Sequence, residues 1–217
     1  MITTGLLGGS FNPAHGGHRA ISLNAIEALG LDELWWLVSP GNPLKPAKGM
    51  APLAARLGAA QCMARRSPIR ATAIEAELGT RYTVDTLKKL VRRYPNRRFI
   101  WIMGADNLAQ LPQGRDWRGI ARLMPIAVVA RPGYNGRTHA AQAMGWLRRF
   151  VRPSGQRLYW TDWRPPALVF LRFSPDVRSA TAIRQADPRW FERYAGRAAR
   201  DSLTRSRLRD GKRKGPA

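Results

Sequence analysis

The chain of 217 residues contains a single cysteine, Cys62, which excludes a disulfide framework and a thiolate metal cluster. No apolar run approaches the roughly 20 residues that a membrane-spanning helix requires. The N-terminal residues carry no charge ahead of their apolar stretch, so they do not resemble a signal peptide. Together, these absences predict a cytoplasmic protein without a membrane segment.

Acidic residues are also few, because 14 Asp and Glu stand against 37 Lys and Arg, for a formal net charge of +23. A charge this positive predicts anionic partners, without choosing between nucleic acid, a membrane surface and small phosphates. An RNA-binding face needs basic residues interleaved with stacking aromatics, and the sequence contains no recognisable RNA-binding motif. We therefore expect no nucleic-acid partner, and we interpret the terminal RSRLRDGKRKGPA as a solvated tail.

Short apolar runs alternate with segments of helical spacing along most of the chain. The predicted strands cover residues 3–9, 33–38, 70–74, 98–103, 126–130 and 168–173. The predicted helices cover residues 16–29, 53–66, 83–93, 117–123, 140–150 and 179–186, with weaker helical sequence over 188–208. This alternation predicts a doubly wound α/β fold with a mostly parallel sheet. We assign residues 1–190 to one domain and residues 191–217 to a basic extension that is helical or mobile.

Glycines and small polar residues follow the first predicted strand in the segment GGSFNPAHGGH, residues 8–18. Gly8 and Gly9 permit either a close approach of the backbone to a ligand or a positive φ. Ser10 or Asn12 is placed to cap the helix that follows. The N-terminus of that helix offers free amides and a partial positive charge, which suit a phosphate.

Two of the chain's 3 histidines, His15 and His18, lie in the same segment. Residues three apart share one face of a helix, so the two imidazoles are expected to contact a polyphosphate together. A zinc pair is less favoured, because no carboxylate or cysteine lies nearby in sequence to complete the ligand set. The pattern is neither GxGxxG nor GxxxxGK[ST], which disfavours an ordinary dinucleotide fold and a P-loop.

A second motif, RSATAIR at residues 178–184, opens a predicted helix near the C-terminus. Ser179 and Thr181 place hydroxyls at the helix start, and Arg184 follows one turn later. Such a group can hold phosphate oxygens by charge-assisted hydrogen bonds. Alone, it is also typical of an ordinary capped helix, so the function rests on the first motif.

The segment GGSFNPAHGGH resembles the GGxFxPxHxGH signature of the HxGH nucleotidyltransferases, and RSATAIR resembles their SxTxxR motif. Within that superfamily the whole chain is similar to the bacterial nicotinate-nucleotide adenylyltransferases. The resemblance implies adenylyl transfer from ATP to nicotinate mononucleotide, with Mg²⁺ accompanying ATP and no metal held by the protein alone. It implies His15, His18 and Arg184 as catalytic residues, and it adds as ATP contacts Gly8, Gly9, Ser10, Phe11, Gly104, Asp106, Ser179 and Thr181.

Four further segments resemble this family: SPGNPLKP after the second strand, YTVDTL, GAD after the fourth strand, and the turn RPG. By resemblance, the mononucleotide contacts are Asn42, Lys45, Arg56, Thr83, Asp106, Trp117 and Arg131. Trp117 would stack on the nicotinate ring, since a flat pyridinium suits an aromatic face.

Each of these positions also has a simpler interpretation. Lys45 and Arg56 are alternatively surface cations, Thr83 a plain helix cap, and Trp117 a core residue. Rival functions are another HxGH transferase, acting on phosphopantetheine or nicotinamide mononucleotide, or an RNA-binding protein. The choice between the acid and the amide of nicotinate depends on the backbone around Thr83 and Trp117.

Overall fold

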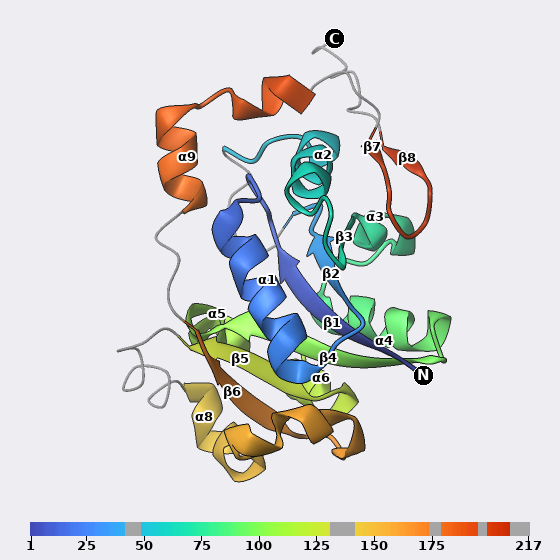
Figure 1. The fold of residues 1–217 in the computed structure, drawn as a ribbon, viewed down its shortest axis with the longest axis vertical. Helices are drawn as coiled ribbons and strands as arrows, with labels where there is room; N and C mark the ends of the chain where they lie inside the picture. The colour runs from blue at the N-terminus through green and yellow to red at the C-terminus, as the bar shows by residue number, and fades with distance from the viewer. Residues whose placement is uncertain (42–48, 131–141, 174–178, 195–198, 209–217) are drawn as a thin grey trace.

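Six parallel strands form one sheet through the middle of the molecule, in the order β3-β2-β1-β4-β5-β6 (Figure 1). The computed structural model describes residues 1–41, 49–130, 142–173, 179–194 and 199–208. The strands are β1 (Ile2–Gly9), β2 (Glu33–Val38), β3 (Ile69–Thr72), β4 (Arg97–Gly104), β5 (Ile126–Ala130) and β6 (Leu168–Arg172). The order reverses beside β1, so the doubly wound parallel fold predicted from the alternation is confirmed.

Helices cover both faces of this sheet (Figure 1). The α-helices are α1 (Gly16–Leu29), α2 (Leu53–Met63), α3 (Ile74–Leu78), α4 (Thr83–Arg93), α5 (Ala105–Gln110), α6 (Trp117–Leu123), α8 (Gln142–Leu147) and α9 (Ala180–Ala186). The 3₁₀-helices are η1 (Leu111–Gln113), η2 (Arg148–Phe150), η3 (Ser154–Asp162) and η4 (Trp190–Tyr194).

Two apolar layers form the core, one on each face of the sheet. Trp36 belongs to the layer beneath α1 and α2, whereas Trp35 belongs to the layer beneath α4, α6 and α8. Both rings are fully buried. Successive residues of a strand point to opposite faces, so this pair of tryptophans anchors β2 between the two layers.

The prediction is wrong in two places that matter for the site. The segment expected as a strand over 70–74 ends at Thr72, and the short helix α3 follows it. The helical expectation for the C-terminal extension is wrong over 199–208, where β7 (Ala199–Arg200) and β8 (Arg207–Leu208) form an antiparallel hairpin. The buried Asp201 carboxylate closes this hairpin by accepting the amides of Leu203 and Thr204, a local bond that competes with helix formation. Residues 209–217 lie outside the described residues.

Candidate active site

The turn after β1 brings the protein backbone close to the central sheet. A Cβ atom added to Gly8 would lie 2.6 Å from the Trp101 ring, and one added to Gly9 would lie 3.2 Å from the Phe11 ring. Neither glycine has a positive φ. Phe11 has φ of 45° instead. The left-handed backbone expected as one reason for these glycines is therefore wrong, and their lack of a Cβ leaves room for the Trp101 and Phe11 rings.

The two histidines of the first motif meet at the start of α1. His15 is the N-cap residue, and its Nδ1 accepts a hydrogen bond of 3.1 Å from the Gly17 amide. The Nδ1 of His18 accepts a reciprocal bond of 3.3 Å from the His15 amide. The ring centroids are 3.9 Å apart. The expectation that Ser10 or Asn12 caps this helix is therefore wrong, because a histidine capping box takes that place.

His18 is held as a neutral imidazole. Burial, and secondarily the neighbouring His15, lower the pKa of His18 to about 3. The Phe11 ring packs on the His18 ring, with 4.9 Å between their centroids, and stacks on the Trp36 ring, with 5.1 Å between theirs. Because Nδ1 of His18 accepts a hydrogen bond, the single proton of the neutral ring must lie on Nε2. The side chain therefore presents a neutral N–H donor.

Asn12 fastens the same turn to the beginning of the next helix. Its Nδ2 donates to the Gly49 carbonyl at 2.9 Å, and its Oδ1 accepts from the Ala51 amide at 3.2 Å. A carboxylate could accept but could not donate. This pairing gives a physical reason for an amide rather than a carboxylate at position 12.

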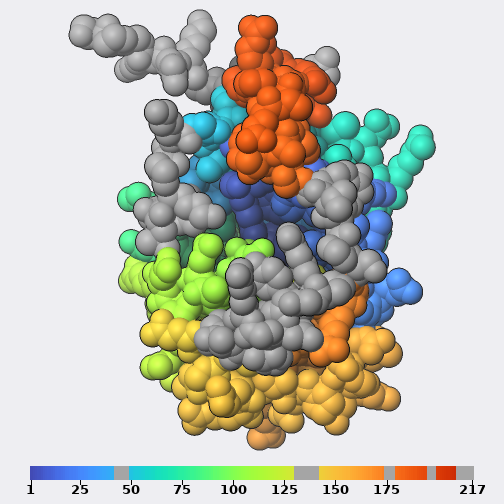
Figure 2. Space-filling view, turned by 90° about the vertical axis from the view of Figure 1, so that its left-hand side faces the viewer, coloured from blue at the N-terminus to red at the C-terminus, as the bar shows by residue number. Residues whose placement is uncertain are grey.

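The second motif lies against the first, although 172 residues separate the contacting positions. Arg184 donates from Nη1 to the Asn12 carbonyl at 2.6 Å and from Nη2 to the Thr181 hydroxyl at 3.2 Å. Ser179 caps α9 by accepting the Ala182 amide at 3.1 Å. In Figure 2 the orange segment that contains α9 lies directly above the dark-blue N-terminal residues. The two predicted phosphate motifs therefore meet at one site.

Arg56 has a different place from the one expected. It is 1% exposed, so the interpretation as a surface cation is wrong. Its guanidinium donates to four backbone carbonyls, those of Ala51 (2.8 Å), Ser10 (2.7 Å), Ser39 (2.7 Å) and Pro40 (3.2 Å). Burial lowers its pKa to about 10, so it stays charged at neutral pH. Arg56 joins the turns that follow β1 and β2, which makes it a positioning residue.

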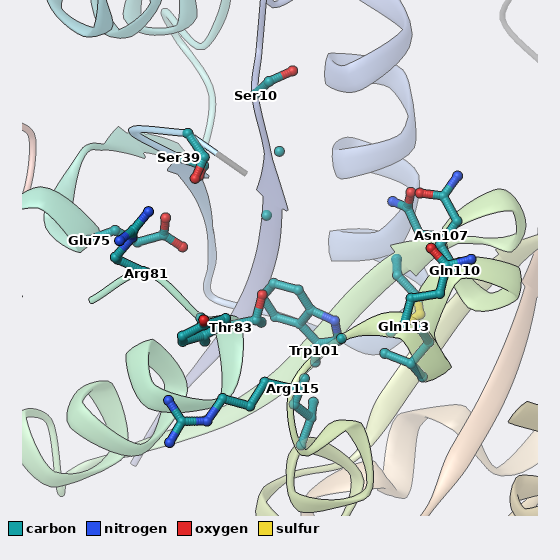
Figure 3. A pocket seen from close by; sticks show the side chains of 18 of the residues that line it. Ser10, Ser39, Glu75, Arg81, Thr83, Trp101, Asn107, Gln110, Gln113 and Arg115 are labelled. Carbon is teal, nitrogen blue, oxygen red and sulfur yellow. The ribbon is translucent and has the colours of Figure 1, made fainter. Parts of the chain in front are cut away.

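A cavity of about 280 Å³ opens beside the turn, at the carboxyl ends of β1, β2 and β4. In Figure 3, Ser39 and Glu75 lie on one side, Asn107 and Gln110 on the other, and the Trp101 ring between them. Gly8, Gly9 and Ser10 form part of the wall. The phosphate turn and the cavity therefore share one border, as expected for ligand sites in a doubly wound sheet.

Among the predicted mononucleotide contacts, Thr83 lines this cavity as the first residue of α4. The interpretation of Thr83 as a helix cap is wrong, because Tyr82 occupies the N-cap position, and its side chain makes no capping hydrogen bond. Gly104 is the N-cap residue of α5, and Asp106 is exposed in its first turn.

Trp117 lies in an adjoining hollow, packed edge to face on Trp146 at 5.6 Å. Gln113 is shared by the hollow and the cavity. Stacking on a ligand in the cavity would therefore require the Trp117 ring to turn. Asn42, Lys45 and Arg131 lie outside the described residues.

Glu75 lines the cavity from the first turn of α3, although no sequence motif singles it out. Burial raises the pKa of Glu75 to about 7, and the Ser39 hydroxyl opposes this rise. The available signal was an acidic residue, in a chain with few of them, directly after the carboxyl end of a predicted strand.

Within the described ranges, no three His, Cys, Asp or Glu side chains converge as a metal-ligand group. No helix among the described residues is both long and apolar enough to cross a membrane.

The fold and the HxGH turn define a nucleotidyltransferase, and the comparisons with known proteins agree. The chain belongs to the cytidylyltransferase-like family, which matches residues 6–186. Within it, the chain belongs to the nicotinate-nucleotide adenylyltransferases. It is 60% identical over 216 residues to a protein of Erythrobacter litoralis named "Probable nicotinate-nucleotide adenylyltransferase", covering 100% of this chain and 98% of that one.

A protein of Parvibaculum lavamentivorans with the same name is 48% identical, covering 85% of this chain and 92% of its own. Among solved structures, the nicotinic acid mononucleotide adenylyltransferase of Plasmodium falciparum, complexed with NaAD, has a TM-score of 0.60. It is 15% identical and covers 85% of this chain and 83% of its own. At this identity the likeness shows the fold.

Proposed function

We propose that this chain transfers the adenylyl group of ATP to nicotinate mononucleotide, giving nicotinate adenine dinucleotide and pyrophosphate in NAD biosynthesis. The observation that carries the proposal is the pair of imidazoles, 3.9 Å apart, at the N-terminus of α1 beside the cavity. The name that the two relatives share supports this pair of substrates. Because the reaction consumes ATP, the proposal places the protein with the nucleotide pool of the cytoplasm.

The reaction requires little general acid–base catalysis. An oxygen of the mononucleotide's 5′-phosphate attacks the α-phosphorus of ATP, and the bond from that phosphorus to the bridging oxygen breaks. Pyrophosphate leaves with the electron pair. The attacking phosphate is already an anion at neutral pH, so the difficulty lies in bringing anions together and stabilising the departing charge.

In this scheme, His18 donates its Nε2–H to an α-phosphate oxygen and stabilises the transition state. A neutral imidazole suits this role, because its proton stays on Nε2 and is not exchanged with solvent during the reaction. His15 contacts the β- or γ-phosphate, and the amides of Gly9 and Ser10 complete the cradle with Arg184. The bonds from Arg184 to Asn12 and Thr181 support this arrangement, because they already fix the guanidinium over the turn.

The remaining roles are assigned by resemblance and position. Ser179 and Thr181 close on the phosphates. Asp106 accepts ribose hydroxyls from the first turn of α5. On the mononucleotide side, the proposed contacts are Asn42, Lys45, Thr83, Trp117 and Arg131.

Magnesium fits the donor chemistry as a companion of ATP. The described groups at the turn are imidazoles and amides, whereas Mg²⁺ prefers oxygen ligands and retains water. Phosphate oxygens would therefore supply most of its shell, and the exposed Asp106 offers a carboxylate oxygen. A bound Mg²⁺ would neutralise part of the triphosphate charge.

Pyrophosphate release tests the proposal. The purified protein is incubated with ATP, Mg²⁺ and, in turn, nicotinate mononucleotide, nicotinamide mononucleotide and phosphopantetheine. We expect the highest kcat/KM with nicotinate mononucleotide. Greater turnover with phosphopantetheine, or no release with any of the three, would refute the assignment.

A further inference from the structure

Glu75 is the one acidic side chain among the described residues that line the cavity. It projects from α3, on the face of the sheet that also carries α4 and α6, whereas the phosphate motifs of α1 belong to the opposite face. Ile74, in the same short helix, belongs to the core layer that contains Trp101. The carboxylate therefore lies on the cavity side of the phosphate turn.

The backbone that carries Glu75 is firmly held. The Asp201 carboxylate, from the C-terminal hairpin, accepts the Ala73 amide at 2.6 Å and the Thr72 hydroxyl at 2.9 Å. The Thr72 hydroxyl accepts the Ile74 amide at 3.1 Å. Glu75 is thereby fixed before any ligand arrives, which lowers the entropic cost of a contact made by its carboxylate.

No cation of the described residues forms a salt bridge with Glu75, even though two arginines, Arg81 and Arg115, line the same cavity. The Ser39 hydroxyl makes a hydrogen bond with its carboxylate, and both side chains lie on one side of the cavity (Figure 3). A partly buried carboxylate without a cationic partner needs hydrogen-bond donors from another source. The cavity lies where a ligand can supply them.

The chemistry of a mononucleotide narrows which of its groups can face Glu75. Its phosphate must reach the turn at Gly8–Ser10 in order to react, and an anion would be repelled by the ionised carboxylate, the form that Glu75 takes above its pKa of about 7. The carboxylate of a nicotinate ring would be repelled for the same reason. The vicinal hydroxyls of the ribose are the remaining polar groups, and they are hydrogen-bond donors.

We propose that the Glu75 carboxylate, oriented by Ser39, accepts hydrogen bonds from the ribose hydroxyls of the mononucleotide and makes the site selective for ribose over deoxyribose. This inference rests on the proposed function, because it assumes that a mononucleotide occupies the cavity. Glu75 is thus a specificity-determining residue in the acceptor half of the site.

The test measures kcat/KM with nicotinate mononucleotide and with its 2′-deoxy and 3′-deoxy analogues. We expect the wild type to disfavour at least one analogue by about 10- to 100-fold, the effect of one hydrogen bond to a charged group. Glu75→Gln should reduce this ratio several-fold by weakening turnover of the ribose substrate, and it should leave the KM for ATP unchanged. Glu77→Gln is the matched control, because Glu77 is exposed on the same helix and pairs with Arg93.

Three results would overturn the inference. One is wild-type enzyme that turns over both deoxy analogues as fast as the ribose substrate, a measurement that needs no variant. Another is Glu75→Gln, folded by its thermal melt, with the wild-type ratio. A third is Glu77→Gln with the same loss as Glu75→Gln. Absence of pyrophosphate release by the wild type with the ribose substrate would instead refute the proposed function.

Discussion

Replacing Arg56 with lysine tests whether one buried guanidinium joins the turns that form the site. Lysine keeps the charge but offers one nitrogen in place of a planar fork. A lysine nitrogen in the place of Nη1 reaches the carbonyls of Ser10 and Ser39, so the carbonyls of Ala51 and Pro40, now served by Nε and Nη2, lose a charged donor. At about 1–2 kcal/mol for each lost bond, Arg56→Lys should lower the free energy of unfolding by about 2–4 kcal/mol.

For a chain of this size, that loss corresponds to a fall in melting temperature of about 4–15 °C. The KM for ATP should also rise, because the Ser10 carbonyl belongs to the turn proposed to hold the triphosphate. Urea denaturation and steady-state kinetics measure the two effects. Arg92→Lys, at an exposed position of α4, is the matched control and should leave both unchanged. An Arg56→Lys protein as stable as the wild type would refute the reasoning.

The remaining predictions concern three side chains. Trp117→Ala should raise the KM for the mononucleotide several-fold with little change in kcat, and an unchanged KM would show that its ring only packs on Trp146. Asp201→Asn places an amide donor against the Thr72 hydroxyl and the Ala73 amide, which are donors themselves, so the free energy of unfolding in urea should fall by about 2–4 kcal/mol. A variant as stable as the wild type would contradict the proposed role of Asp201 in holding Thr72 and Ala73. The pKa of Glu75 is raised from 4.5 to about 7 in the folded protein. Between pH 4.5 and pH 7 the folded state therefore keeps a proton that the unfolded state loses. The stability of the wild type falls as the pH rises through this range. Glu75→Gln lacks this effect, so its stability relative to the wild type should grow by about 1–3 kcal/mol from pH 5 to pH 7.5, and a pH-independent difference would argue against the raised pKa.

Local sequence was sufficient for the parts of the fold set by short-range rules. The helices Gly16–Leu29 and Thr83–Arg93 were predicted with their observed bounds, because glycine after the first and a proline beyond the second mark their ends. The buried strands were predicted from their short apolar runs, which are likewise a local signal. The hairpin at 199–208 was missed because its turn depends on Asp201, whose carboxylate also bonds Thr72 and Ala73 far away in sequence.

The site was predictable to the extent that its motifs are contiguous. The spacing of His15 and His18 indicated a shared site, although the capping box that joins them requires His15 outside the helix rather than on its face. The contact of Arg184 with Asn12 spans most of the chain, so no local pattern reveals it. Burial likewise decides the role of Arg56, and burial is a property of the assembled fold.

The rate of the His18→Ala enzyme is the most direct test of the polyphosphate cradle at the start of α1. Loss of one preorganised donor to the transition state corresponds to about 3–4 kcal/mol, or roughly 10²–10³-fold in kcat. We predict that decrease, measured as pyrophosphate release at saturating ATP and nicotinate mononucleotide, with a thermal melt that shows an intact fold. A kcat within a few-fold of the wild type would contradict the account.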